Sequence, residues 1–376
     1  MTLADASKRI KKEFEGALTS AEEGPTQVES VSTGVLSLDR ILGVGGMPKG
    51  RIVEIFGPPS SGKTWLAYQL AAQVQKQGGV VGWVDAEHSF NLDWARRQGV
   101  DLSAEKLGLT HPQYAEEALR QVQIYTEAGA DLVVLDSIGQ LIPEKQAADE
   151  LGTVHVAGIA RLLTTSLKII RPLCYRTGAI VYLVNQLRAN ITGYGDIPIT
   201  PGGWALEHNC AIRLSLHTTA AKSRLVVESG TPVGQNVRAR VVKSNVDVPG
   251  RETEFAIDFR HGYQVEEDLL EIAVEFGLVR RSGGWTHFAD EKFHGKPAAV
   301  DFLRGHPGYA EQLLESVLDA MRNRTTLDDT VGDQVDAQVE AMMNETPAPE
   351  DPDDEARVPD TLLPGFGDST GDGATS

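Results

Sequence analysis

The chain has 376 residues, of which 41% are hydrophobic and 23% charged, so it is long enough for two globular domains with tails. No run of eighteen apolar residues occurs, and the N-terminal segment lacks the apolar region of a secretory signal. We therefore expect a cytoplasmic protein with no membrane association. Cys174 and Cys210 lie in apolar contexts and are expected to be reduced core residues rather than a disulfide.

The net charge of −18 is concentrated at the C-terminus. Residues 325–376 contain 14 acidic residues and one arginine, which leaves −5 for the rest of the chain. This tail is rich in Pro, Gly and acids and is predicted to be disordered. It serves solubility, or it competes as a polyanion for basic sites on the body. Its residues 362–366 could form a partner-binding peptide.

The chain begins with one short predicted helix over residues 5–18. Ile10, Phe14 and Leu18 form a narrow apolar stripe on it. So short a helix is marginal alone, and we expect it to pack on its own domain or on a neighbouring subunit. Together with a linker over 19–30 it makes up the predicted N-terminal segment, 1–33.

Residues 34–265 alternate strand and helix, which predicts an α/β domain with a mostly parallel sheet. The expected parallel strands are 51–56, 80–85, 130–137 and 178–186, with helices at 64–78, 91–98, 113–128 and 155–171. Three later segments alternate and are interpreted as antiparallel strands, namely 211–218, 235–245 and 253–259. A small separate domain of short helices is expected over 266–324.

The segment GPPSSGKT lies between the first strand and the helix that follows it. It fits the pattern G-x-x-x-x-G-K-[ST], in which backbone N–H groups surround phosphates, lysine reaches the β- and γ-phosphates and a hydroxyl binds Mg²⁺. The helix N-terminus adds an anion site. The predicted phosphate loop consists of Gly57, Pro58, Pro59, Ser60, Ser61, Gly62, Lys63 and Thr64.

Polar residues follow the other predicted parallel strands. Asp136 can hold Mg²⁺ with Thr64, or it caps the end of its strand. Glu87 can deprotonate an attacking water, a role for which its neighbours Asp85 and His88 compete. Gln186 can touch the γ-phosphate and report its presence to the next loop, or it is an ordinary strand-end amide. Trp94 stacks on the base or belongs to the core. From the residues alone, we expect a Mg²⁺-dependent ATPase.

Two long connections, 144–158 and 187–203, follow carboxyl ends of the strands, where ligands bind in such folds. Their length predicts a functional or disordered role.

Several motifs together resemble the bacterial RecA recombinases: VSTGVLSLDRILGVGGMPKGRIVEIFGPPSSGKT, VDAEHS, VVLDSI, VNQLR and TPGGWALE, in this order. The resemblance covers roughly residues 8–324. It implies a RecA-like ATPase core, an N-terminal helical arm and a small α+β C-terminal domain. It also implies helical filaments on single-stranded DNA that pair with double-stranded DNA and exchange strands in repair and recombination, using ATP and Mg²⁺.

The resemblance implies roles for particular residues. Glu87 activates water, Asp136 serves the metal, Gln186 senses the nucleotide and Trp94 takes the place of a base-stacking Tyr. Residues 149–158 and 187–203 resemble the two DNA-binding loops. The residues at matching positions are Arg161, Arg188, Gly202 and Gly203 for DNA, and Phe14, His208 and Lys243 for the contact with the next subunit. If the resemblance holds, a local stripe of Arg161, Lys168 and Arg188 suffices for contact with DNA phosphates even on an acidic body.

The chain also departs from the family pattern. RecA proteins usually carry two lysines, two positions apart, that reach the neighbour's γ-phosphate; Lys243 matches the first, but Asn245 occupies the second. Pro59 replaces a Glu, Trp204 an Asn and His208 a Phe. These changes indicate a divergent member, such as a phage-encoded one. The alternatives are a filament protein or regulatory paralogue with weak strand exchange, and a RecA-fold ATPase of another class.

Overall fold

A 10-stranded sheet forms the centre of the structure, a computed structural model that describes residues 2–13, 28–148, 158–187, 200–219, 225–228, 231–259, 262–288 and 291–324. Its strands follow the order β12-β11-β10-β8-β3-β7-β6-β4-β5, and β9 pairs with β10. The bounds are β3 Ile52–Gly57, β4 Val81–Asp85, β5 Leu107–Thr110, β6 Leu132–Asp136, β7 Ile180–Gln186, β8 Ile212–Thr218, β9 Leu225–Glu228, β10 Thr231–Ser244, β11 Glu252–Asp258 and β12 Gly262–Tyr263.

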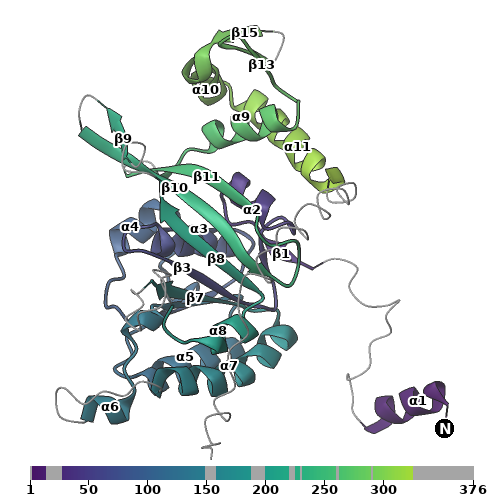
Figure 1. The fold of residues 1–376 in the computed structure, drawn as a ribbon, viewed down its shortest axis with the longest axis vertical. Helices are drawn as coiled ribbons and strands as arrows, with labels where there is room; N and C mark the ends of the chain where they lie inside the picture. Colours follow the sequence, from purple (N-terminus) through teal and green to yellow (C-terminus); the bar gives the residue numbers. More distant parts are fainter. Residues whose placement is uncertain are drawn as a thin grey trace, which may run out of the picture. The chain divides into compact units, whose positions relative to one another are not determined.

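Helices cover both faces of this sheet (Figure 1). Successive side chains of a strand point to opposite faces: Val53 and Ile55 of β3 join the core beneath α3, whereas Ile52 joins the core beneath α5 and α7. The helices in this part of the chain are α2 Leu36–Ile41, α3 Lys63–Lys76, α4 Leu92–Arg97, α5 Ala115–Glu127, η1 Ile138–Gln140, α6 Glu144–Ala148, α7 Gly158–Thr177 and α8 Trp204–Asn209. The short strands β1 Ser30–Val31 and β2 Met47–Pro48 pair with each other.

The α/β class and the mostly parallel sheet are confirmed, with one correction. Residues 211–218 were expected to form an antiparallel strand, but β8 pairs in parallel with β3. Only its other neighbour, β10, is antiparallel. The prediction was wrong because the alternation in β8 does not mark a solvent-exposed face: its polar residues Arg213 and Ser215 are buried.

The C-terminal segment has its own hydrophobic core, built around Leu270, Ala299 and Val317. Besides α9 Val265–Glu275, α10 Gly295–Gly305 and α11 Pro307–Arg324 it contains a 3-stranded sheet of β13 Arg280–Ser282, β14 Trp285–Phe288 and β15 Glu291–His294. The expectation of helices alone here was therefore incomplete, whereas the α+β character is observed. The boundary at 265/266 stays a prediction.

The N-terminal helix α1 spans Leu3–Glu13, and its apolar residues Leu3 and Ile10 are 86% and 38% exposed. Phe14 and Leu18 lie outside the described residues, as do Arg188 and the acidic tail. Cys174 and Cys210 are buried and free, as predicted. Within the described ranges, no helix is long and apolar enough to cross a membrane.

Candidate functional site

The phosphate loop joins β3 to α3, as its sequence predicted. Gly62 lies at the N-cap of α3 with φ +92°, a left-handed conformation that favours glycine. Lys63 opens the helix, and its ammonium donates to the carbonyl oxygens of Gly57, at 3.1 Å, and Pro58, at 2.8 Å. Burial lowers the pKa of Lys63. A cation thus lies inside a loop that opens a helix, which is the arrangement that binds a polyphosphate.

Thr64 and Asp136 meet beside this loop. The Thr64 hydroxyl donates to Asp136 Oδ2 at 2.7 Å, from the first turn of α3 to the end of β6. Asp136 is 2% exposed, and its Oδ1 has no hydrogen-bond partner in the described structure. Burial, together with Glu87 and Asp85, raises the pKa of Asp136 to about 7. A buried carboxylate oxygen without a partner, next to a hydroxyl, fits the oxygen ligands that Mg²⁺ prefers.

Glu87 lies between the ends of three parallel strands. It follows β4, its Oε1 accepts from the hydroxyl of Ser137 after β6, and the same oxygen accepts from Gln186 Nε2 of β7 at 2.7 Å. The Asp85 carboxylate instead accepts hydrogen bonds from the backbone N–H groups of Ser89 and Phe90, and so stabilises the turn after β4. The structure therefore brings Lys63, Thr64, Glu87, Asp136 and Gln186 to one edge of the sheet. The sequence analysis did not identify Ser137 as a site residue. The only feature that could have indicated it is its position directly after Asp136.

Trp94 lies on α4 and is half-buried against the core that contains α3. Part of the Trp94 side chain therefore belongs to the core, as one of its two interpretations predicted. Stacking of its exposed part on a base stays a prediction. His88, the other neighbour of Glu87, adopts φ +53° and stacks on His111 with the ring centroids 5.4 Å apart.

The described DNA candidates lie on α7 and just before α8. Arg161 and Lys168 are exposed and seven positions apart, which places them on one side of α7. Gly202 packs closely on this helix: with φ +102°, an added Cβ would lie 2.8 Å from Leu163 Cδ1. Gly203 has φ +55° and ψ −148°, a backbone conformation that is nearly restricted to glycine.

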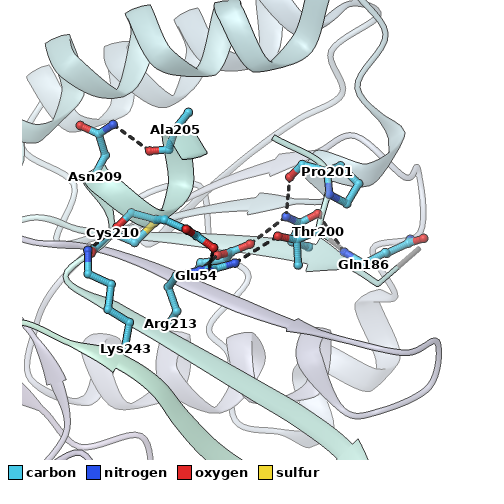
Figure 2. Close-up of polar contacts among 11 residues, drawn as sticks. Glu54, Gln186, Thr200, Pro201, Ala205, Asn209, Cys210, Arg213 and Lys243 are labelled. Carbon is cyan, nitrogen blue, oxygen red and sulfur yellow. Dashed lines mark hydrogen bonds and ion pairs between the residues drawn. The ribbon is translucent and has the colours of Figure 1, made fainter. Parts of the chain in front are cut away.

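The described interface candidates gather around α8. His208 is exposed and stacks on Trp204, which is 74% exposed. Lys243 Nζ donates to the carbonyl oxygens of Glu207 and, at 3.0 Å, of Cys210 (Figure 2). Lys243 thus caps the C-terminal end of α8 in its own subunit. In the described ranges it makes no hydrogen bond or ion pair with the phosphate-loop residues of the same chain.

The geometry agrees with comparisons to known proteins. A family model for the RecA N-terminal domain matches residues 1–264. The chain belongs to the RecA family. Its sequence is 37% identical to the RecA protein of Wolinella succinogenes over 337 residues, which cover 88% of this chain and 94% of that protein. RecA of Nitratiruptor sp. is 37% identical over 84% of this chain, and RecA of Thermus aquaticus 36% over 85%; the matches cover 92% and 94% of those proteins.

RecA proteins are ATP-dependent DNA recombinases with DNA-dependent ATPase activity. The matched relatives cover most of this chain and 94% of their own length, which supports the same activity for this chain. The chain is an ATP-dependent DNA recombinase of recombination and repair, as its motifs predicted. The alternative of a RecA-fold ATPase of another class is not supported.

Proposed function

We propose that the cluster at the carboxyl ends of β3, β4, β6 and β7 binds ATP with Mg²⁺ and hydrolyses it when the chain forms a filament on DNA. The observation that carries this proposal is the hydrogen bond between Gln186 and Glu87. It joins the carboxylate suited to activate water to the last residue of β7, directly before the segment 187–203 that resembles a DNA-binding loop.

The loop Gly57–Thr64 holds the phosphates, with Lys63 turning from its backbone carbonyls to the β- and γ-phosphate oxygens. Thr64 and Asp136 would hold Mg²⁺, which neutralises charge on the phosphate oxygens. Because a metal ligand must be deprotonated, binding of the ion favours the ionised form of Asp136. Trp94 would contact the base from α4.

Glu87 acts as the general base. Ser137 and Gln186 both bind Oε1 and fix the orientation of the carboxylate, so that the proton of an attacking water is taken up at Oε2. Gln186 donates either to Glu87 or to a γ-phosphate oxygen. A switch between these acceptors would change the start of segment 187–203.

DNA contact is assigned to Arg161, Lys168, Arg188, Gly202 and Gly203. We propose that the partners are single-stranded and double-stranded DNA, bound through their phosphates and therefore with strong salt dependence. The filament would form through Phe14, His208 and Lys243, in a head-to-tail contact that does not close. Leu3 and Ile10 of α1 are apolar and exposed in the single chain, as expected of a helix that docks on another subunit.

The test is ATP hydrolysis with and without single-stranded DNA at two salt concentrations. We expect strong stimulation by DNA that weakens as salt rises. Turnover that is high and indifferent to DNA would contradict the proposed link between the two sites. Strand-exchange assays then separate a full recombinase from a filament protein with weak exchange.

A further inference from the structure

A buried polar cluster lies on the face of the sheet that α8 covers. Glu54, in the middle of the apolar strand β3, is fully buried. It stands directly opposite Arg213 in the register of β3 and β8, and Arg213 Nε donates to Glu54 Oε2 at 2.5 Å. Burying two charges is costly unless their remaining hydrogen-bonding atoms are also bound.

The rest of the Arg213 guanidinium binds the segment that leads into α8. Nη1 donates to Glu207 Oε1 of α8 at 2.8 Å, and Nη2 donates to Thr200 Oγ1 at 3.1 Å (Figure 2). The guanidinium also lies over the ring of Phe56, 5.1 Å from its centroid. One planar side chain therefore holds β3, α8 and the residue before Pro201 in fixed relative positions.

Asn185 connects this cluster to the nucleotide site. Its Nδ2 donates to Glu54 Oε1 at 2.8 Å and to the carbonyl oxygen of Pro201 at 2.9 Å. Its Oδ1 accepts from the backbone N–H of Gln186 at 2.9 Å, and the Gln186 side chain binds Glu87. A continuous path therefore connects the Glu87 carboxylate to Thr200 and α8. It consists of hydrogen bonds and of the peptide link between Asn185 and Gln186.

We propose that Arg213 is a positioning residue that couples the ATP site to the DNA-binding segment, and so sets how strongly DNA stimulates hydrolysis. This inference rests on the proposed function, in which Gln186 senses the nucleotide and residues 200–203 approach DNA. A shift of β7 at Gln186 moves Asn185, which is bound to Pro201 and to Glu54. Arg213 makes Thr200 and Glu207 move with Glu54 rather than independently of it.

The chemistry of the cluster favours positioning over stability. A buried ion pair adds little stability compared with apolar residues of the same size, but it fixes one geometry among several. Lysine could keep the charge beside Glu54, yet its single ammonium cannot reproduce the three-armed contact of the guanidinium. Arg213→Lys is therefore expected to keep the fold and loosen the link.

The experiment compares four full-length proteins: wild type, Arg213→Lys, the neutral double variant Glu54→Gln with Arg213→Gln, and Arg238→Lys. Arg238 is the matched control, because it also pairs with a glutamate, Glu254, but on an exposed part of the sheet. The measurements are thermal stability, kcat and KM for ATP with and without single-stranded DNA, and DNA affinity at two salt concentrations.

We expect Arg213→Lys to retain DNA-free kcat and KM and the salt-dependent DNA affinity of the wild type. Stimulation of kcat by DNA should fall by at least about fivefold, the lower end of ordinary coupling between two sites. The double variant should show the same loss, and Arg238→Lys none. A purely structural role would change stability and leave the stimulation ratio of the folded fraction intact.

Two outcomes would overturn the inference in distinguishable ways. If wild type is stimulated by DNA and the folded Arg213 variants are stimulated equally, Arg213 has no coupling role while the proposed function stands. If wild type itself is not stimulated, the proposed function fails and the inference fails with it.

Discussion

Gln186 Nε2 and Glu87 Oε1 are 2.7 Å apart, so the side chains that end β7 and follow β4 are directly hydrogen-bonded. Ser137 binds the same Glu87 oxygen. In the part of the chain that the structure describes, Oε2 has no such contact and is the oxygen that can accept a proton from water. In the proposed mechanism the two oxygens of this carboxylate therefore have separate tasks, because one fixes its orientation and the other would take up the proton.

Glu87→Gln tests this division. The amide oxygen of the substituted side chain can still accept from Ser137 and Gln186, but the amide nitrogen in place of Oε2 cannot take up a proton. We expect ATP binding to be retained and DNA-stimulated kcat to fall about 10²- to 10⁴-fold, the usual range for a general base. Nucleotide binding and hydrolysis are measured side by side, with the exposed Glu105→Gln as control. Turnover at the wild-type rate would show that another group activates the water.

Lys63→Ala tests the phosphate loop. Lys63 is the buried cation of this loop, and it is the group proposed to contact the β- and γ-phosphates. We expect loss of hydrolysis together with weaker ATP binding, measured by titration with a fluorescent ATP analogue. Lys76→Ala, in the last turn of the same helix, should leave both unchanged. Normal ATP affinity in Lys63→Ala would assign phosphate binding to the backbone alone.

The ATP-site candidates could be predicted from the sequence because their signals are local. The phosphate loop lies between a strand and a helix, and Asp136, Glu87 and Gln186 each follow an apolar parallel strand. Since such strands end at one edge of a sheet, their convergence follows from the fold class. Ser137 escaped notice because a serine after a strand carries no distinguishing pattern.

The buried cluster around Arg213 could not be predicted, and it also misled the strand assignment. In residues 211–218 a polar residue alternates with an apolar one, which is typical of a strand with one exposed face. Arg213 and Ser215 are instead buried, and Arg213 is paired with Glu54 from a segment 159 residues away in the chain. A long-range ion pair of this kind leaves no mark in local periodicity.

Asp39 gives a pH dependence of stability. Its carboxylate is 4% exposed, and burial raises its pKa to about 7 despite hydrogen bonds from Ser32 and Thr33. The folded state therefore binds a proton that the unfolded state has released, so this group's stabilisation is lost as pH rises through about 7. Between pH 6 and pH 8 the loss is on the order of 1 kcal/mol.

Asp39→Asn removes this titration and can keep an acceptor for Thr33. The wild type should lose stability relative to the variant between pH 6 and pH 8, measured as the difference in unfolding free energy or Tm at the two values. Titrating groups without an interaction with Asp39, such as Asp136, are common to both proteins and cancel in this difference, whereas Asp268, which interacts with Asp39, is part of the measured change. The exposed Asp93→Asn should show no such change. A difference between wild type and Asp39→Asn that is constant with pH would place the pKa of Asp39 outside this window.

Asn245 occupies the position where the family usually carries the second lysine that reaches the neighbour's γ-phosphate. It is exposed directly after β10, and its backbone N–H is bound to the carbonyl oxygen of Ala211 at 2.8 Å. The main chain is thus fixed while the side chain points into solvent, so Asn245→Lys should fold normally. A second cation at the subunit contact would stabilise charge that develops during phosphoryl transfer.

We expect Asn245→Lys to raise DNA-stimulated kcat by about tenfold. A rigidly held donor contributes about 10²- to 10³-fold to kcat, and the lysine effect is expected to be smaller because its side chain is flexible. DNA-free turnover should not change, because in the proposed function the neighbouring subunit is brought into place only in the filament on DNA. Asn245→Gln is the control, with a longer but neutral side chain. An equal effect of the two variants would show that charge at this position does not limit turnover.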